Sequence, residues 1–186
     1  MSQQAPILLQ LFGQPELRGF TGRVITRFAG GKSLHLLAIL ALSPGQDFKR
    51  VDLVAELWPG LSHEDGRNRL NVALHHVRKS LMALIGSRAD RALVSSRGCI
   101  KLEAGLIDVD LVRFEANAQQ ILLQPSGTVN RGHVSMLLEQ ARSGVMLGYS
   151  DDWAITRGMR ISNLVEHLQP LAENVLQQLK RVRSTG

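Results

Sequence analysis

The stretch RNRLNVALHHVRKSL, residues 67–81, combines an apolar stripe with a polar, cationic face. The stripe follows spacings of four and three residues and continues beyond the stretch, at Leu70, Leu74, Val77, Leu81 and Leu84. This spacing places the five side chains on one side of an α-helix, and Gly86 ends the pattern. We therefore predict a helix that begins at about His63 or Gly66 and ends at Ile85.

The face opposite the leucines carries side chains suited to nucleic acid, namely Asn68, Arg69, Val72, His75, His76 and Lys79. The major groove is about 12 Å wide and admits one α-helix, whose Arg and Asn side chains can pair with base edges. Asn68 and Arg69 lie near the expected helix N-terminus, where the dipole favours phosphate. Arg78, His76 and Lys79 are better suited to phosphates, which position a protein without specifying sequence. A solvated face is the alternative.

The elements around this helix favour binding over solvation. Upstream, the pattern predicts three short strands, a buried helix with Ser33 as its N-cap, and a second helix, over residues 7–13, 15–20, 24–31, 32–43 and 51–58. Downstream, residues 91–105 predict a hairpin around Arg97-Gly98. An N-terminal antiparallel sheet, three helices and a wing hairpin make an α+β winged helix.

After Gly105 the pattern becomes helical throughout. We predict helices over residues 108–123, 133–149 and about 160–183, with Pro170 kinking or splitting the last one. Three helices joined by short turns are typical of the beginning of a helical-repeat array. The chain is therefore predicted to form two domains, a winged helix over residues 1–105 and an all-α domain over residues 106–186.

The positive charge of the chain lies entirely in its first part. The net charge is +6, and residues 1–107 hold 14 Lys and Arg against 8 Asp and Glu, whereas residues 108–186 hold 8 of each. This division suggests an anionic partner for the first part, either nucleic acid or an acidic membrane surface. No apolar run approaches the roughly 18 residues of a membrane span. A single cysteine, Cys99, excludes an internal disulfide framework and fits an intracellular compartment.

Other kinds of site are poorly supported by the sequence. His75 and His76 are adjacent, so their side chains diverge by about 100° on a helix and do not easily chelate one metal ion. Cys99 is expected to be a small buried residue of the wing, with a redox role as the alternative because Arg97 and Lys101 are near. The run Gly30-Gly31-Lys32-Ser33 lacks the upstream glycine of a phosphate-binding loop. We predict no enzymatic activity, no metal and no cofactor.

Several stretches carry a family resemblance, namely VDLVAELWPG (51–60), RNRLNVALHHVRKSL (67–81), ALVSSRGCIKLEAG (92–105), IDVDLVRFE (107–115) and DDWAITRG (151–158). In these stretches the chain resembles the antibiotic regulatory protein (SARP) family of bacterial transcription activators. Members join an OmpR-type winged helix to a helical bacterial transcriptional activator domain (BTAD) built of TPR-like repeats. The chain departs from the family at Gly98-Cys99, where a Gly-Tyr pair is usual. Its helical domain is also short, which fits a truncated chain or a short member.

The resemblance implies promoter DNA and RNA polymerase as partners. It makes residues 67–85 the recognition helix, residues 91–105 the wing that reaches the minor groove, and Trp58 through Gly66 the loop that can face RNA polymerase. Together with the charged face of the helix, it gives the candidate DNA-binding residues Arg67, Asn68, Arg69, Val72, His75, His76, Arg78, Lys79, Ser95 and Arg97.

We therefore predict a sequence-specific DNA-binding transcriptional regulator, an activator of the bacterial cytoplasm and nucleoid with no membrane partner. Its helical domain packs against the winged helix or forms a homodimer. The alternative is a protein–protein adaptor whose winged helix no longer binds DNA and whose helical domain recruits a partner. Salt-sensitive affinity for duplex DNA separates the two, because counterion release needs several phosphate contacts.

Overall fold

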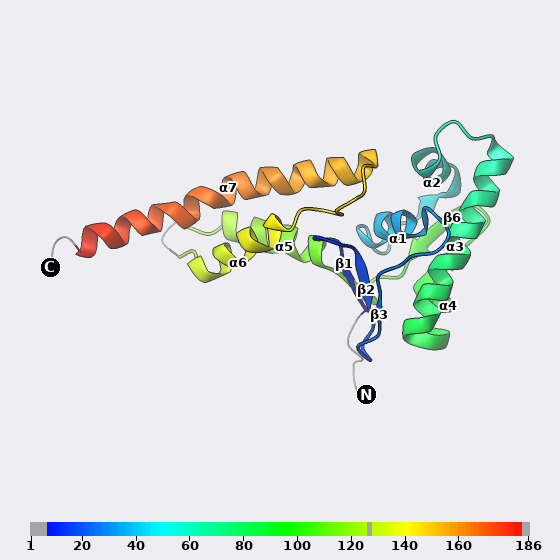
Figure 1. The fold of residues 1–186 in the computed structure, drawn as a ribbon, viewed down its shortest axis with the longest axis horizontal. Helices are drawn as coiled ribbons and strands as arrows, with labels where there is room; N and C mark the ends of the chain where they lie inside the picture. Colours follow the sequence, from blue (N-terminus) through cyan, green and yellow to red (C-terminus); the bar gives the residue numbers. More distant parts are fainter. Residues whose placement is uncertain (1–6, 126–127, 184–186) are drawn as a thin grey trace. The chain divides into compact units, whose positions relative to one another are not determined.

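The computed structural model describes residues 7–125 and 128–183, with side chains up to residue 172 (Figure 1). The chain divides into two compact units. Within the described residues, the first unit comprises 7–10 and 16–109, and the second comprises 11–15 and the chain from Asp110 onward. Each unit is described by itself below.

A four-stranded sheet opens the first unit, in the order β3-β2-β1-β7. Its strands are β1 (Ile7–Gln10), β2 (Glu16–Arg18), β3 (Val24–Ile25) and β7 (Ile107–Val109). The first three form the expected antiparallel meander, but β7 pairs with β1 in parallel, with Ile7 opposite Ile107. The prediction of a purely antiparallel sheet is therefore wrong, as is the prediction that residues 108 and 109 are helical. Ile107 and Val109 are both buried, so alternation rather than helical periodicity governs this segment.

The helices of the first unit are α1 (Ser33–Ala41), α2 (Arg50–Leu57), α3 (His63–Ile85) and the short α4 (Ala89–Ala92). Helix α3 packs against both α1 and α2. The predicted apolar stripe is confirmed, because its five members, Leu70, Leu74, Val77, Leu81 and Leu84, are all buried. Burial of each such side chain contributes about 1.5–3 kcal/mol. This packing holds α3 in place with its opposite face exposed.

The start of α1 differs from the prediction. Ser33 is the first residue of the helix rather than its N-cap, and its hydroxyl donates to the carbonyl oxygen of Ala29. Gly30 and Gly31 both have positive φ angles, so the chain turns back there and brings that carbonyl within reach. The start of α3 is capped in the usual way, because Ser62 Oγ accepts from the backbone N–H of Asp65 at 3.1 Å.

The predicted wing hairpin is present. Strands β5 (Leu93–Ser95) and β6 (Cys99–Leu102) pair antiparallel, and β4 (Phe48–Lys49) completes a three-stranded sheet in the order β4-β6-β5. Ser96 closes the turn, since its hydroxyl accepts from the N–H of Cys99 at 3.0 Å. Ile100 and Leu102 are buried, whereas Cys99 is only half-buried. The expectation of a buried cysteine is therefore wrong, because Cys99 lies on the opposite face of its strand.

The second unit contains α5 (Asp110–Leu122), α6 (Arg131–Arg142) and α7 (Asp152–Arg183), with α6 and α7 side by side (Figure 1). Helix α6 ends earlier than predicted, because Gly144 adopts a φ of 71°. Helix α7 begins at Asp152, earlier than the predicted start at about residue 160, and continues through Pro170, so the predicted split is wrong. Pro170 is exposed. The sequence also indicates Val175, Leu176 and Leu179 as apolar-face residues of this helix, and their side chains lie outside the described ones.

A buried carboxylate ties the start of α5 to a segment far earlier in the chain. Asp110 accepts hydrogen bonds from the backbone N–H groups of Leu11 at 2.8 Å, Phe12 at 3.1 Å and Leu111 at 2.8 Å. The rings of Phe12 and Phe114 meet edge to face, with centroids 5.2 Å apart. Burial raises the pKa of Asp110 above its usual range, against the opposing effect of the three backbone donors. Asp110 thereby fixes residues 11–15 within the second unit.

An ion pair joins α5 to α7. Glu115 Oε1 lies 3.1 Å from Arg157 Nη1 and 3.8 Å from Arg160 Nε. The side chains of Glu115 and Arg157 are only 12% and 18% exposed, so each depends on the other for its polar contacts. No described helix is long and apolar enough to span a bilayer.

Candidate nucleic-acid interface

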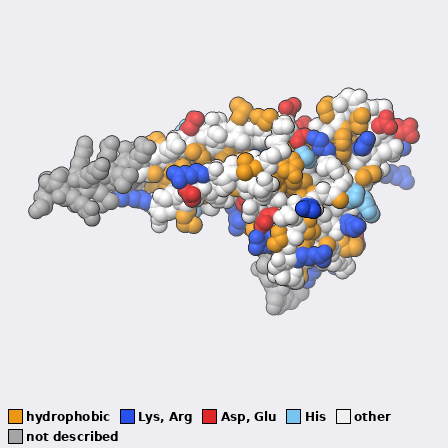
Figure 2. Space-filling model, in the orientation of Figure 1, with side chains coloured by type: hydrophobic (Ala, Val, Ile, Leu, Met, Phe, Trp, Pro, Cys, Tyr) orange, Lys and Arg blue, Asp and Glu red, His pale blue; other side chains and the backbone are white. Residues whose placement is uncertain are grey.

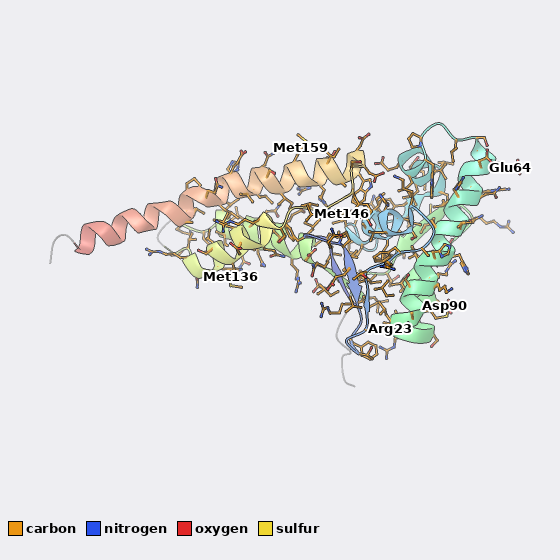
Figure 3. All side chains as sticks on the ribbon, viewed as in Figure 1. Arg23, Glu64, Asp90, Met136, Met146 and Met159 are labelled. Carbon is orange, nitrogen blue, oxygen red and sulfur yellow. The ribbon has the colours of Figure 1, made fainter. Side chains whose placement is uncertain are left out.

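The outward face of α3 is cationic over its middle turns. Figure 3 labels Glu64 at the first turn of α3 and Asp90 in α4, beyond its other end, so the acidic residues flank this region. Between them, the exposed predicted residues are Arg67, Asn68, Arg69, Val72, His75 and Lys79. Val72 is 52% exposed, so its methyl groups are accessible to a partner. Figure 2 shows Lys, Arg and His side chains on the right-hand part of the view, where Figure 1 draws α3.

The start of α3 changes one part of the prediction. Because the helix begins at His63, Asn68 and Arg69 lie in its second turn. The first turn carries Glu64 and Asp65, and the helix dipole weakens beyond that turn. The dipole therefore does not direct phosphate to Asn68 and Arg69, and any contact they make depends on their own side chains.

His76 lies at one edge of the exposed face and is only half-buried. A Cβ atom added at Gly30 would lie 2.2 Å from His76 Cδ2, so the loop before α1 passes directly over the imidazole. The rings of His75 and His76 meet edge to face, with centroids 5.5 Å apart. Of the two histidines, His75 is therefore the outward one. Among the described residues, no group of three His, Cys, Asp or Glu side chains is placed to hold a metal ion.

The opposite edge of the face contains an arginine that the sequence analysis did not select. Arg50, the first residue of α2, donates through Nη1 to Ser95 Oγ at 3.0 Å and through Nη2 to Asn71 Oδ1. Its backbone N–H donates to the carbonyl oxygen of Gly98 in the wing turn at 3.0 Å. Burial, followed by repulsion from Arg78, lowers the pKa of Arg50. One residue thus joins α2, α3 and the wing.

The sequence contained only a weak signal for these contacts. Arg50 stands at the start of a predicted helix, where a solvated arginine is unremarkable. Asn71 lies one turn from Asn68 and Arg67, so a helical projection places it on the edge of the same face. Their pairing depends on how α2, α3 and the wing pack, which local periodicity does not encode.

A hollow of about 350 Å³ lies where α2, α3 and the wing turn meet. It is lined by Arg50, Val51, Val54, His63, Arg67, Leu70, Arg97 and Gly98. Two predicted residues, Arg67 and Arg97, are thus brought together with Arg50, and a third, Ser95, is held by Arg50 beside α3. The lining includes no acidic side chain.

No carboxylate among the described residues neutralises the positive charge around this hollow. Among residues 7–125 and 128–172, Arg50, Arg67 and Arg97 form no salt bridge with a carboxylate. Clefts lined by one sign of charge concentrate field lines and attract counter-ions. The arrangement can therefore bind an anionic group that approaches from the exposed face of α3.

The fold and this face define a winged helix joined to a helical domain. Neither the scan of protein-family models nor the search of curated proteins found a match. Among solved structures, Mycobacterium tuberculosis EmbR in complex with a low-affinity phosphopeptide is similar, with a TM-score of 0.54 and 14% sequence identity. The match covers 92% of this chain and 42% of the EmbR chain, so this chain spans less than half of that length. The likeness shows that the two chains share a fold over the matched residues.

Proposed function

We propose that the protein is a DNA-binding transcriptional regulator, an activator that docks α3 in the major groove of promoter DNA and the wing in the adjacent minor groove. The observation that carries this proposal is the exposed stripe of α3, with Asn68, Val72, His75 and Lys79 pointing away from a fully buried leucine stripe. An α-helix fits the major groove, and Asn and Val side chains suit base edges and thymine methyl groups. Arg97, at the exposed wing turn, supplies a cation for the DNA backbone beside the minor groove.

Fluorescence anisotropy with labelled duplex DNA selected from a promoter library tests this proposal. We expect Arg69→Ala and His75→Ala each to weaken binding by about 5- to 150-fold, since one good base contact contributes about 1–3 kcal/mol. Arg142→Ala is the matched control, because Arg142 is an exposed arginine of the second unit. Unchanged affinity in both α3 variants would exclude this face as the recognition surface.

The loop between α2 and α3 is the proposed contact with RNA polymerase. It comprises residues 58–62, since residues 63–66, which were also predicted to belong to this loop, form the start of α3. Leu61 is 43% exposed there. We expect Leu61→Ala to lower transcription from a bound promoter while leaving DNA affinity unchanged, because Leu61 lies outside the exposed stripe. In vitro transcription, with anisotropy in parallel, measures both. Equal transcription with the variant and the wild-type protein would exclude this loop as the contact with RNA polymerase.

An adaptor is the second candidate, and one observation favours it. Large apolar side chains are exposed on the second unit, namely Leu123 at 86%, Met136 at 71%, Met159 at 65% and Ile155 at 50%. Figure 3 labels Met136 and Met159, whereas Met146 is buried. Ile155 and Met159 lie one turn apart on α7, and adjacent exposed apolar groups are a feature of protein–protein contacts, including homodimers. An adaptor without DNA binding would show little salt-dependent affinity for duplex DNA.

A further inference from the structure

We propose that Arg50, Asn71 and Ser95, together with Arg67 and Arg97, form a site for one phosphodiester group of duplex DNA, in which Arg50 orients Asn71 as a hydrogen-bond donor. The inference rests on the proposed function and assigns a role to a pair of side chains at the edge of the interface. Its basis is the direction of two hydrogen bonds. The hollow beside them supplies a second, independent observation.

The direction of the Arg50 bonds follows from the chemistry of guanidinium. Arginine has only donors, so the atom of Asn71 that faces Arg50 must be the carbonyl oxygen Oδ1. The Nδ2 amide group of Asn71, with its two hydrogens, then points elsewhere. In the same way, Ser95 Oγ accepts from Arg50 at 3.0 Å, which leaves the hydroxyl proton of Ser95 free to donate outward. Arg50 thereby converts two neutral side chains into outward donors.

This polarity restricts what Asn71 can bind. Pairing of an asparagine with adenine requires a free Oδ1 to accept and a free Nδ2 to donate. Because Oδ1 already accepts from Arg50, a bidentate contact with adenine would have to share that oxygen with the guanidinium. An acceptor-rich partner suits it better, and a phosphate oxygen is such a partner. Base recognition is then left to the outward stripe at Asn68, Val72 and His75.

The hollow beside these donors is lined by positively charged side chains. Arg67 and Arg97 line it together with Arg50, and no carboxylate among the described residues neutralises them. Arg67 from α3 and Arg97 from the wing therefore meet around one cationic concavity, which Arg50 links to Asn71 and Ser95. A phosphodiester group of the DNA backbone bound there would fix the register of the recognition helix and the wing together.

The test uses the full chain, a labelled duplex of mixed sequence and anisotropy over a range of salt concentrations. Asn71→Asp is the informative variant, because it keeps a partner for Arg50 but replaces the outward amide donors with acceptors. We expect affinity to fall about tenfold and the log–log salt slope to become shallower by about 0.9, the loss of one phosphate contact. Gln46→Glu, an exposed change in the same unit, adds the same charge and should have little effect.

The salt slope of a second variant and two measurements on the wild-type protein complete the test. Arg97→Ala should also flatten the slope by about 0.9. Inorganic phosphate should compete no better than chloride at equal ionic strength, since the site is built for a phosphodiester held by the duplex. Stronger competition by phosphate, or wild-type affinity and slope in Asn71→Asp, would overturn the inference while leaving DNA binding intact. Absence of wild-type binding to DNA would instead remove the proposed function itself.

Discussion

The arginines around the hollow of the first unit differ from two arginines of the second unit in their partners. In the second unit, Arg157 lies 3.1 Å from Glu115 and Arg142 lies 2.6 Å from Glu139, so these positive charges are neutralised by the unit's own carboxylates. Around the hollow of the first unit, no described carboxylate pairs with Arg50, Arg67 or Arg97. A mostly buried pair such as Arg157 with Glu115 stabilises the fold, whereas arginines without a carboxylate partner on a shared concave surface are available to an anionic partner.

The largest expected effect on stability concerns the mostly buried ion pair of the second unit. Glu115→Ala removes the carboxylate partner of Arg157, whose side chain is mostly buried. Loss of one partner of a buried pair typically lowers the free energy of unfolding by about 3–5 kcal/mol. Urea denaturation followed by far-ultraviolet circular dichroism measures the loss. Glu139→Ala breaks an exposed pair and should cost under about 0.5 kcal/mol. Equal losses in the two variants would show that burial of the pair is not what makes it stabilising.

The next effect concerns the carboxylate that holds residues 11–15 in the second unit. Asp110→Ala removes the acceptor for three backbone N–H groups, so we expect a loss of about 2–4 kcal/mol. Asp110→Asn retains one carbonyl oxygen and should lose about half as much. Thermal unfolding of both variants measures the difference. If Asp110→Ala unfolds at the wild-type temperature, the bonds to Leu11 and Phe12 do not stabilise the unit.

Much of the first unit could be predicted from the sequence, because its elements have strong local signals. The buried stripe of α3 and the wing hairpin are set by residues a few positions apart. The parallel pairing of Ile7 with Ile107 could not be predicted, since nothing local indicates it. The bond from Leu11 to Asp110, which spans 99 positions, was hidden for the same reason. Helix α7 passes through Pro170 although the local rule predicts a break.

In the candidate site too, local patterns predict some features and tertiary packing determines the others. The outward stripe of α3 follows from helical periodicity, so Asn68, Val72 and His75 are exposed as expected. Half-burial of His76 depends on the loop at Gly30, and the link from Arg50 to Ser95 depends on the packing of the wing. Such contacts arise from tertiary structure, where local patterns carry no information.

A smaller effect tests the edge of α3 opposite to Arg50. In Gly30→Ala the added methyl would lie 2.2 Å from His76 Cδ2, at a φ of 83° that alanine rarely adopts. Gly31→Ala is the matched control, because its φ of 63° is also positive but its Cβ would meet open space. We expect each to lose about 1 kcal/mol from backbone strain, and Gly30→Ala to lose about 1–2 kcal/mol more from displacing the imidazole. Equal melting temperatures would show that the loop does not hold His76.

The smallest effect on stability belongs to the unpaired arginines. Arg67→Ala should change the free energy of unfolding by less than about 0.5 kcal/mol, because Arg67 is exposed and has no ion pair among the described residues. The same variant should weaken binding to duplex DNA by about tenfold, the loss expected for one charge-assisted contact. Chemical denaturation and anisotropy measure the two quantities. If the variant is destabilised but binds duplex DNA with normal affinity, Arg67 stabilises the fold and does not contact DNA.

The salt dependence of wild-type binding to mixed-sequence duplex DNA tests the central claim most directly. If the face formed by α3 and the wing contacts the DNA backbone through at least three cationic groups, the logarithm of the association constant should fall with the logarithm of salt concentration, with a slope of about −3 or steeper. A slope near zero, or no binding at low salt, would contradict the account.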